Sequence, residues 1–205
     1  MTDVSPERSR SILPFSSRFS RSLVAAALGF ASVALTSTHA YAIERQHHLG
    51  LAPALGILKI DGKSTTSTGI GGALHYAYGL TDAWNLSVEA SSVIVAADQK
   101  QDFAYSPRNR PATVDHGAIG VGYVIDILRW VPYIGVHGGV YRLAGGTLDE
   151  ALFLPGISLG AGLDYQLSRQ FAVGAAVREH LMFSKLDTYP SYTTLLLRFE
   201  YMWGY

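Results

Sequence analysis

Six ionisable residues interrupt segments that are otherwise built of apolar and small side chains. They are His75, Glu89, Asp164, Arg178, Arg198 and Glu200. Carboxylates, guanidinium groups and an imidazole can pair with one another, and paired charges tolerate a confined, poorly hydrated space. We predict a charge network in which the carboxylates neutralise the arginines and the histidine, so that the group acts as a plug. A gate or a narrow, porin-like path for ions or small solutes is the alternative.

Other site chemistries find little support in the sequence. The chain has no cysteine, which excludes thiolate metal sites and cysteine nucleophiles. His47 and His48 are adjacent, so on a strand they point to opposite faces and cannot bind one metal ion together. Beyond the first 21 residues the sequence has no cluster of basic residues. We therefore predict no metal site, no cofactor and no nucleic-acid partner.

The charged residues belong to short segments in which apolar residues alternate with small or polar ones. Strict alternation over about ten residues, bounded by turn residues, is typical of transmembrane β-strands. Eight segments follow this pattern, at residues 47–60, 68–80, 84–96, 113–125, 131–143, 156–167, 171–183 and 192–205. An even number of strands can close, so we predict an all-β fold, an eight-stranded antiparallel up-and-down transmembrane β-barrel.

The connections between these segments differ in length. GLTDAW, DILRWVP and LSRQF are short, whereas DGKSTTS, ADQKQDFAYSPRNRPA, AGGTLDEALFLP and SKLDTYPS are longer. Short turns at one end and longer loops at the other are typical of outer-membrane barrels, whose short turns face the periplasm. Both ends of the barrel domain are then expected on the short-turn side.

The two faces of the predicted strands differ in side-chain size. Leu195, Leu197 and Phe199 share one face of the last strand, and in the other strands small or charged residues oppose the bulky ones. A soluble barrel would bury the bulky face and present to water a surface of Gly, Ala and Ser, which is unfavourable for solubility. The bulky face is therefore expected to meet lipid. In segment 131–143 both faces carry large residues, and its faces are not assigned.

Aromatic residues gather on the short-turn side of this arrangement. Trp84, Trp130 and Phe171 lie beside the short turns, and the chain closes on the alternating residues Phe199, Tyr201, Trp203 and Tyr205. Amphipathic rings are favoured at a membrane interface. We predict that these aromatic residues form a belt there.

The N-terminal residues are typical of an export signal. Four arginines precede an apolar stretch from Leu23 to Leu35, and AYA at residues 40–42 has the small-x-small pattern of a cleavage site. We predict a cleaved signal peptide over residues 1–42 and a barrel domain over residues 43–205. An uncleaved anchor is the alternative, but the apolar stretch is shorter than the roughly 20 residues that cross a bilayer as a helix.

The export signal, the alternating segments, the turns YGLTDAW and YQLSRQF and the closing aromatic strand resemble the small outer-membrane barrel proteins of Gram-negative bacteria. This group contains OmpX and the transmembrane domain of OmpA. The resemblance implies a location in the cell outer membrane, among its lipids and lipopolysaccharide, and a structural or surface-interaction role. It also implies that the barrel assembly machinery reads the terminal aromatic residues, although Phe is more usual than Tyr205 in the last position.

The longest connection suggests a further partner. The loop over residues 97–112 carries Lys and Arg residues that suit anionic groups, so it is a candidate contact for an extracellular ligand. A solvated loop without a partner is the alternative.

One stretch could support catalysis in such a barrel. Lipid A deacylases with this fold use His, Ser and Glu, and REHLMFSK offers Glu179, His180 and Ser184. His180 and Ser184 do not have the spacing of that family's motif. We therefore predict that the protein is not an enzyme, with a lipid A-modifying barrel as the remote alternative.

Overall fold

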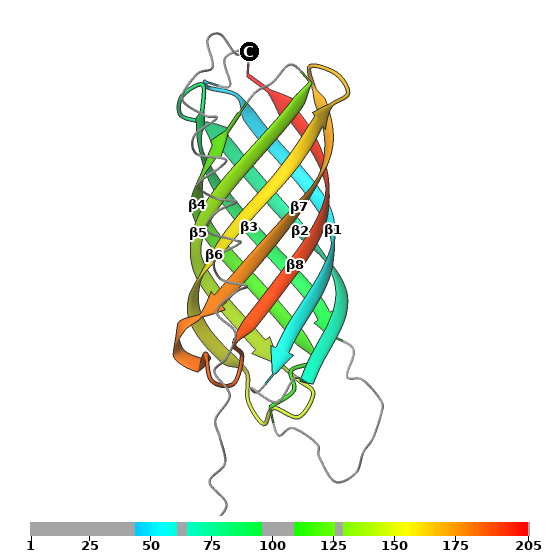
Figure 1. Ribbon diagram of the computed structural model, residues 1–205, viewed down its shortest axis with the longest axis vertical. Helices are drawn as coiled ribbons and strands as arrows, with labels where there is room; N and C mark the ends of the chain where they lie inside the picture. Colours follow the sequence, from blue (N-terminus) through cyan, green and yellow to red (C-terminus); the bar gives the residue numbers. More distant parts are fainter. Residues whose placement is uncertain (1–43, 61–64, 96–108, 126–128, 205) are drawn as a thin grey trace, which may run out of the picture. The chain divides into compact units, whose positions relative to one another are not determined.

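Eight antiparallel strands close into a barrel in the computed structural model of the protein (Figure 1). The structure describes residues 44–60, 65–95, 109–125 and 129–204, so the predicted signal peptide and Tyr205 lie outside the described part. The strands are β1 (His47–Ile60), β2 (Thr65–Gly79), β3 (Trp84–Val95), β4 (Thr113–Val124), β5 (Trp130–Ala144), β6 (Leu152–Gln166), β7 (Phe171–Met182) and β8 (Ser191–Trp203). Each strand pairs with its neighbour in sequence, and β1 pairs with β8, so the predicted up-and-down barrel is confirmed.

Most strand ends lie within two residues of the prediction, but two strands begin three or four residues early. β2 begins at Thr65 and β6 at Leu152, before the expected starts at 68 and 156, because the added residues pair with β1 and β5. The connection between β1 and β2 is therefore residues 61–64, and the prediction of a longer loop there was wrong. The longer connections 96–112, 145–151 and 183–190 still share one end of the barrel, opposite the turns 80–83 and 167–170. A short 3-10 helix, η1 (Phe183–Lys185), follows β7.

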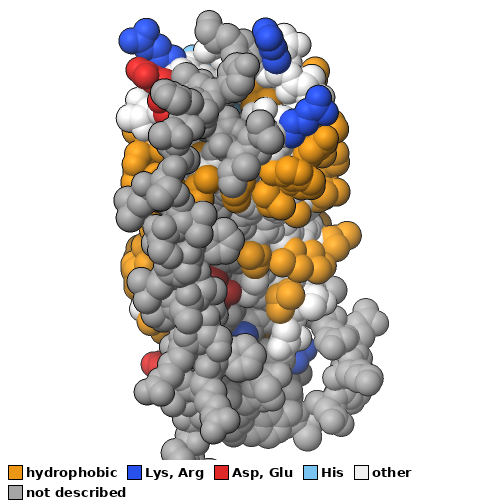
Figure 2. Space-filling view, turned by 45° about the horizontal axis from the view of Figure 1, so that its top comes forward, with side chains coloured by type: hydrophobic (Ala, Val, Ile, Leu, Met, Phe, Trp, Pro, Cys, Tyr) orange, Lys and Arg blue, Asp and Glu red, His pale blue; other side chains and the backbone are white. Residues whose placement is uncertain are grey.

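Side chains alternate between the outer wall and the interior in every strand. In β5, Ile134, Val136 and Val140 are exposed on the outer wall, whereas His137 and Tyr141 are buried inside. The faces of this strand, which the sequence did not assign, thus follow the same rule as the others. Figure 2 shows the result as a band of apolar side chains around the visible wall, with charged side chains near the short-turn end. Such a wall is stable against lipid rather than water. Among the described residues, no helix is long and apolar enough to cross a membrane.

The half of the interior nearest the long connections is filled with bulky apolar side chains. We call this group the apolar layer; its fully buried members are Leu58, Ile60, Val93, Val114, Leu143 and Met182. They occupy the inward positions near the long-connection ends of their strands. The sequence predicts small and charged residues in the lumen, and this apolar layer was not predicted. Together the side chains leave little room for water in that half of the barrel.

The long connections contact one another where they leave the barrel. The Tyr189 hydroxyl donates a hydrogen bond to the Asn109 carbonyl oxygen at 2.9 Å, and its ring packs into the apolar layer. Arg110 and Thr147 exchange two hydrogen bonds of 2.9 Å, one between backbone groups and one from the Arg110 amide to the Thr147 hydroxyl. Gly145 and Gly146, both with positive φ, make the turn that brings Thr147 to Arg110. These contacts join the described parts of the long connections at that end of the barrel.

Candidate functional site

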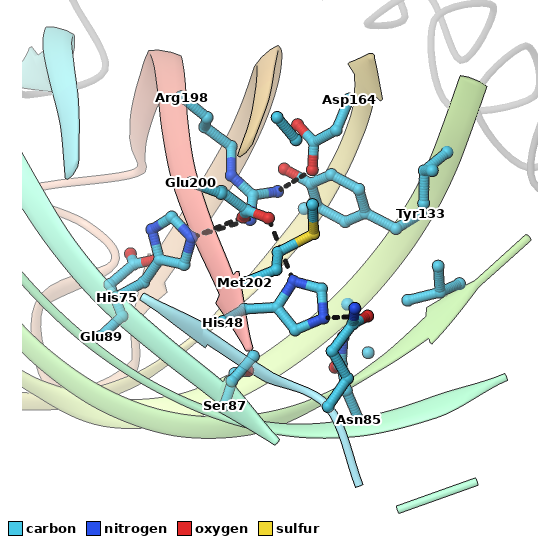
Figure 3. A pocket seen from close by; sticks show the side chains of 18 of the residues that line it. His48, His75, Asn85, Ser87, Glu89, Tyr133, Asp164, Arg198, Glu200 and Met202 are labelled. Atoms are coloured by element: carbon cyan, nitrogen blue, oxygen red, sulfur yellow. Dashed lines mark hydrogen bonds and ion pairs between the residues drawn. The ribbon is translucent and has the colours of Figure 1, made fainter. Parts of the chain in front are cut away.

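A polar pocket of about 60 Å³ occupies the half of the interior nearest the short turns (Figure 3). Glycine and alanine at inward positions such as Ala77, Gly122, Gly135 and Gly160 leave this space open. All six ionisable residues predicted from the sequence are buried inside the barrel, with between 3% and 7% of their surface exposed. The structure divides them between two neighbouring groups, one around Arg198 and one around Arg178.

Arg198 in β8 bridges two carboxylates. Its Nη1 atom lies 3.2 Å from Asp164 Oδ2 in β6, and its Nη2 atom forms an ion pair with Glu200 Oε1, two residues along β8. The guanidinium group also lies 4.3 Å from the centre of the Tyr133 ring in β5, a cation–π contact. One buried cation thus faces two buried carboxylates, and the strand alternation places Arg198 and Glu200 on the same interior face.

Two histidines bind the second carboxylate of this group. His75 Nε2 in β2 lies 2.6 Å from Glu200 Oε1 and 2.9 Å from Arg198 Nη2, and His48 Nδ1 in β1 lies 3.2 Å from Glu200 Oε2. The other ring nitrogen of His48 lies 3.1 Å from the side-chain oxygen of Gln46. We call His48, His75, Asp164, Arg198 and Glu200 the Arg198 group. With neutral histidines its formal charge is −1.

The second group lies between the Arg198 group and the apolar layer. Arg178 in β7 forms an ion pair with Glu89 in β3, and His116 Nδ1 in β4 lies 3.8 Å from the same carboxylate. His137 in β5 and His180 in β7 are also buried inside the barrel, and the His116 and His180 rings lie 5.1 Å apart. We call Glu89, Arg178, His116, His137 and His180 the Arg178 group. With neutral histidines it carries no net charge.

Hydrogen bonds to hydroxyl groups and ring contacts position His116, His137 and His180. His137 Nε2 lies 2.8 Å from the Ser87 hydroxyl, and His180 lies 3.0 Å from the Tyr141 hydroxyl and 2.9 Å from the Thr194 hydroxyl. The His116 ring stacks on Tyr141, with centroids 4.6 Å apart. Tyr141 belongs to the buried apolar cluster, so the Arg178 group is in direct contact with the apolar layer.

Sequence reasoning missed four of the interior histidines as members of this site. His48, His116, His137 and His180 all stand at inward positions of their strands, so the alternation could have identified them. His137 was not identified as an interior residue, because the faces of its strand were not assigned. His48 was expected to face away from His47, and it does: His47 lies on the outer wall, where it contacts Tyr76 and stacks on Trp203.

The residues considered for catalysis do not converge. His180 points into the barrel, whereas Glu179 lies on the outer side, where it accepts hydrogen bonds from Ser191 at 2.6 Å and Thr193 at 2.5 Å. Ser184 belongs to η1, beyond the end of β7. The barrel wall separates the imidazole from the carboxylate, so they cannot act on one substrate. Among the residues that the structure describes, no group of His, Asp and Glu could hold a metal ion.

Aromatic side chains lie on the outer wall near the short turns. Trp84, Trp130 and Phe171 are exposed there, and each ring contacts a tyrosine of a neighbouring strand. Phe199, Tyr201 and Trp203 also lie on the outer face of β8, where the Tyr201 and Trp203 rings stack with centroids 5.6 Å apart. The arrangement is suited to an interface between lipid and water.

Gly50 in β1 provides a test of how His75 is positioned. A Cβ atom at Gly50 would lie 2.2 Å from the His75 ring, which is held against Glu200. We expect Gly50→Ala to displace this ring and to lower the free energy of unfolding by about 1–3 kcal/mol, measured by urea unfolding of the refolded barrel. Gly117→Ala is the control, because a Cβ atom there meets nothing within 4 Å. Equal stability of the two variants would contradict the described position of His75.

Residues 28–202 match the family described as the outer membrane protein beta-barrel domain. No curated protein matched the chain. Among solved structures, Ail, the attachment invasion locus protein of Yersinia pestis, is 18% identical with a TM-score of 0.52, and the match covers 78% of this chain and 99% of that one.

Two further structures share the fold at low sequence identity. Neisserial surface protein A is 13% identical with a TM-score of 0.57, and the match covers 81% of this chain and 100% of that one. The outer membrane protein OprG of Pseudomonas aeruginosa is 13% identical with a TM-score of 0.53, covering 79% of this chain and 98% of that one. These likenesses concern the fold.

Proposed function

The chain belongs to the outer membrane protein β-barrel domain family, and we propose that it is a non-enzymatic barrel with a plugged lumen and a structural or surface-interaction role. Its location is the cell outer membrane. The observation that carries the proposal is the filling of the interior. Two ion-paired groups follow one another along the lumen, and beyond them lies the apolar layer.

The energetics of the ion-paired groups and of the apolar layer support a closed lumen. Buried charges such as Arg178 and Glu89 are tolerated only when they are paired, and the pairing holds them across the lumen between opposite strands. Leu58, Val114 and Leu143 are fully buried inside the barrel, and apolar side chains of this kind are unfavourable neighbours for hydrated ions. A narrow channel for ions or small solutes is the alternative, and the pocket of about 60 Å³ near the short turns is the feature that favours it.

Release of a trapped salt from proteoliposomes tests the plug. At about pH 7.5, where histidine is mostly neutral, we expect the wild-type barrel to release salt no faster than vesicles without protein. A wild-type sample that was never refolded is the matched control for incorporation damage. Rapid release by the folded barrel would contradict the plug and favour the channel.

The outer surfaces support the proposed surroundings. The apolar wall and the rings of Trp84, Trp130 and Phe171 suit outer-membrane lipids and their interface, and the ends of the long connections suit contact with lipopolysaccharide or an extracellular ligand. Ail, which shares the fold, has been crystallised with the heparin analogue sucrose octasulfate. We include in the proposal a ligand contact through the loop 97–112, of which residues 97–108 lie outside the described part. Recognition of Phe199, Tyr201, Trp203 and Tyr205 by the barrel assembly machinery is likewise part of the proposal.

A further inference from the structure

We propose that acid opens the plug, because protonation of the histidines around Arg178 loads the polar part of the lumen beside the apolar layer with unpaired positive charge. The inference rests on the proposed plug and adds its regulation. Five of the histidines in the chain point into the barrel: His48, His75, His116, His137 and His180. Histidine is the side chain that ordinarily gains its charge between about pH 5 and 8.

The Arg198 group has one more carboxylate than it has permanent cations. Asp164 and Glu200 face the single cation Arg198, and His48 and His75 both contact Glu200. Tyr133 from β5 packs against Arg198, and Glu89 from β3 lies opposite His75 in the strand register. One proton on a histidine brings the group from −1 to zero. The Gln46 amide beside His48 can turn to accept or to donate a hydrogen bond, so it suits both forms of the ring.

The Arg178 group has no excess negative charge, because its one carboxylate is matched by its one arginine. Glu89 from β3 already pairs with Arg178. The titratable residues around this ion pair are the three histidines of the group and two tyrosines: His116, His137, Tyr141, His180 and Tyr192, from β4, β5, β7 and β8. His75 lies opposite Glu89 in the register of β2 and β3. Each proton taken up by His116, His137 or His180 therefore adds a positive charge beside Arg178 without a new partner.

Protonation of these histidines is expected to disturb the apolar layer as well, because their rings contact it. The His116 and His180 rings lie 5.1 Å apart, His116 stacks on Tyr141, and His180 lies 4.8 Å from the Tyr192 ring. Both tyrosines belong to the buried apolar cluster. Repulsion among the protonated rings is relieved when water enters between them, and water there separates the rings that support the apolar layer. The positive charges left in the hydrated lumen should favour anions.

Conductance of the full-length mature barrel in planar bilayers tests the proposal. Between about pH 7.5 and about pH 4, we expect wild-type conductance to rise about tenfold or more, with anion preference, because burial beside Arg178 delays protonation of these rings until the solution is clearly acidic. A variant with His116→Gln, His137→Gln and His180→Gln should lose this rise. His47→Gln is the matched control, because His47 lies on the outer wall and should leave the response unchanged.

Folding of each variant is checked by electrophoretic mobility of the unheated barrel. If the triple variant fails to fold, His180→Gln alone replaces it, and this variant should lower the acid response by about half or more. A wild-type barrel that stays closed at both pH values overturns the acid response and leaves the plug intact. A triple variant that responds as wild type does, or acid unfolding in place of conductance, also overturns it. Conductance at neutral pH overturns the plug itself and the inference with it.

Discussion

Arg198→Ala should lower the free energy of unfolding by about 3–5 kcal/mol, because it leaves two buried carboxylates without their shared cation. Asp164 and Glu200 both contact Arg198, and all three side chains are almost fully buried. The loss will be smaller to the extent that water enters the pocket and hydrates the carboxylates. Urea unfolding of the refolded barrel in lipid vesicles measures the change.

Arg142→Ala is the matched control for this variant. Arg142 forms an ion pair with Asp115 at 2.7 Å, but it lies on the outer side of β5 with 48% of its side chain exposed. An exposed pair of this kind contributes about 0–1 kcal/mol. If both arginine variants lose the same stability, the Arg198 group is not buried in the way described.

Leu197→Arg should lower the free energy of unfolding by about 2–4 kcal/mol, the cost of a cation facing lipid at the centre of a barrel wall. Leu197 lies in the middle of β8, and 52% of its surface is exposed on the apolar outer wall. The same reversible unfolding assay in lipid vesicles measures the loss.

Leu186→Arg makes the same substitution outside the strands. Leu186 follows η1 in the connection between β7 and β8 and is 42% exposed, so its replacement should change stability by less than about 1 kcal/mol. A loss at Leu186 as large as that at Leu197 would contradict the assignment of the outer wall to lipid.

Period-two alternation made most of the fold predictable from the sequence. It gave the number of strands, their order and the lipid-facing side of residues such as Leu197, because one face of each strand is bulky and the other small. The start of β2 was predicted less accurately, because Thr66 and Ser67 are consecutive polar residues and so resemble a loop. The conformation at such positions depends on pairing with β1, which local sequence does not record.

The interior was less predictable than the wall. Spacing placed Arg178, Arg198 and their carboxylates inside, but the division into two groups depends on the shear of the barrel and on rotamers. The apolar layer was missed because Leu58 and Val114, read along their own strands, look like lipid-facing residues. Only the register across strands places them in one layer.

The plug is tested most directly by the conductance of the double variant Arg178→Ala, Arg198→Ala beside wild type at neutral pH. The ion pairs hold Glu89, Asp164 and Glu200 across the lumen, so removing both cations leaves carboxylates that attract water and cations. We predict that wild type conducts little or not at all, and that the double variant shows larger, cation-preferring conductance. Stable ion-selective channels in wild type, with the same conductance in the double variant, would contradict the account.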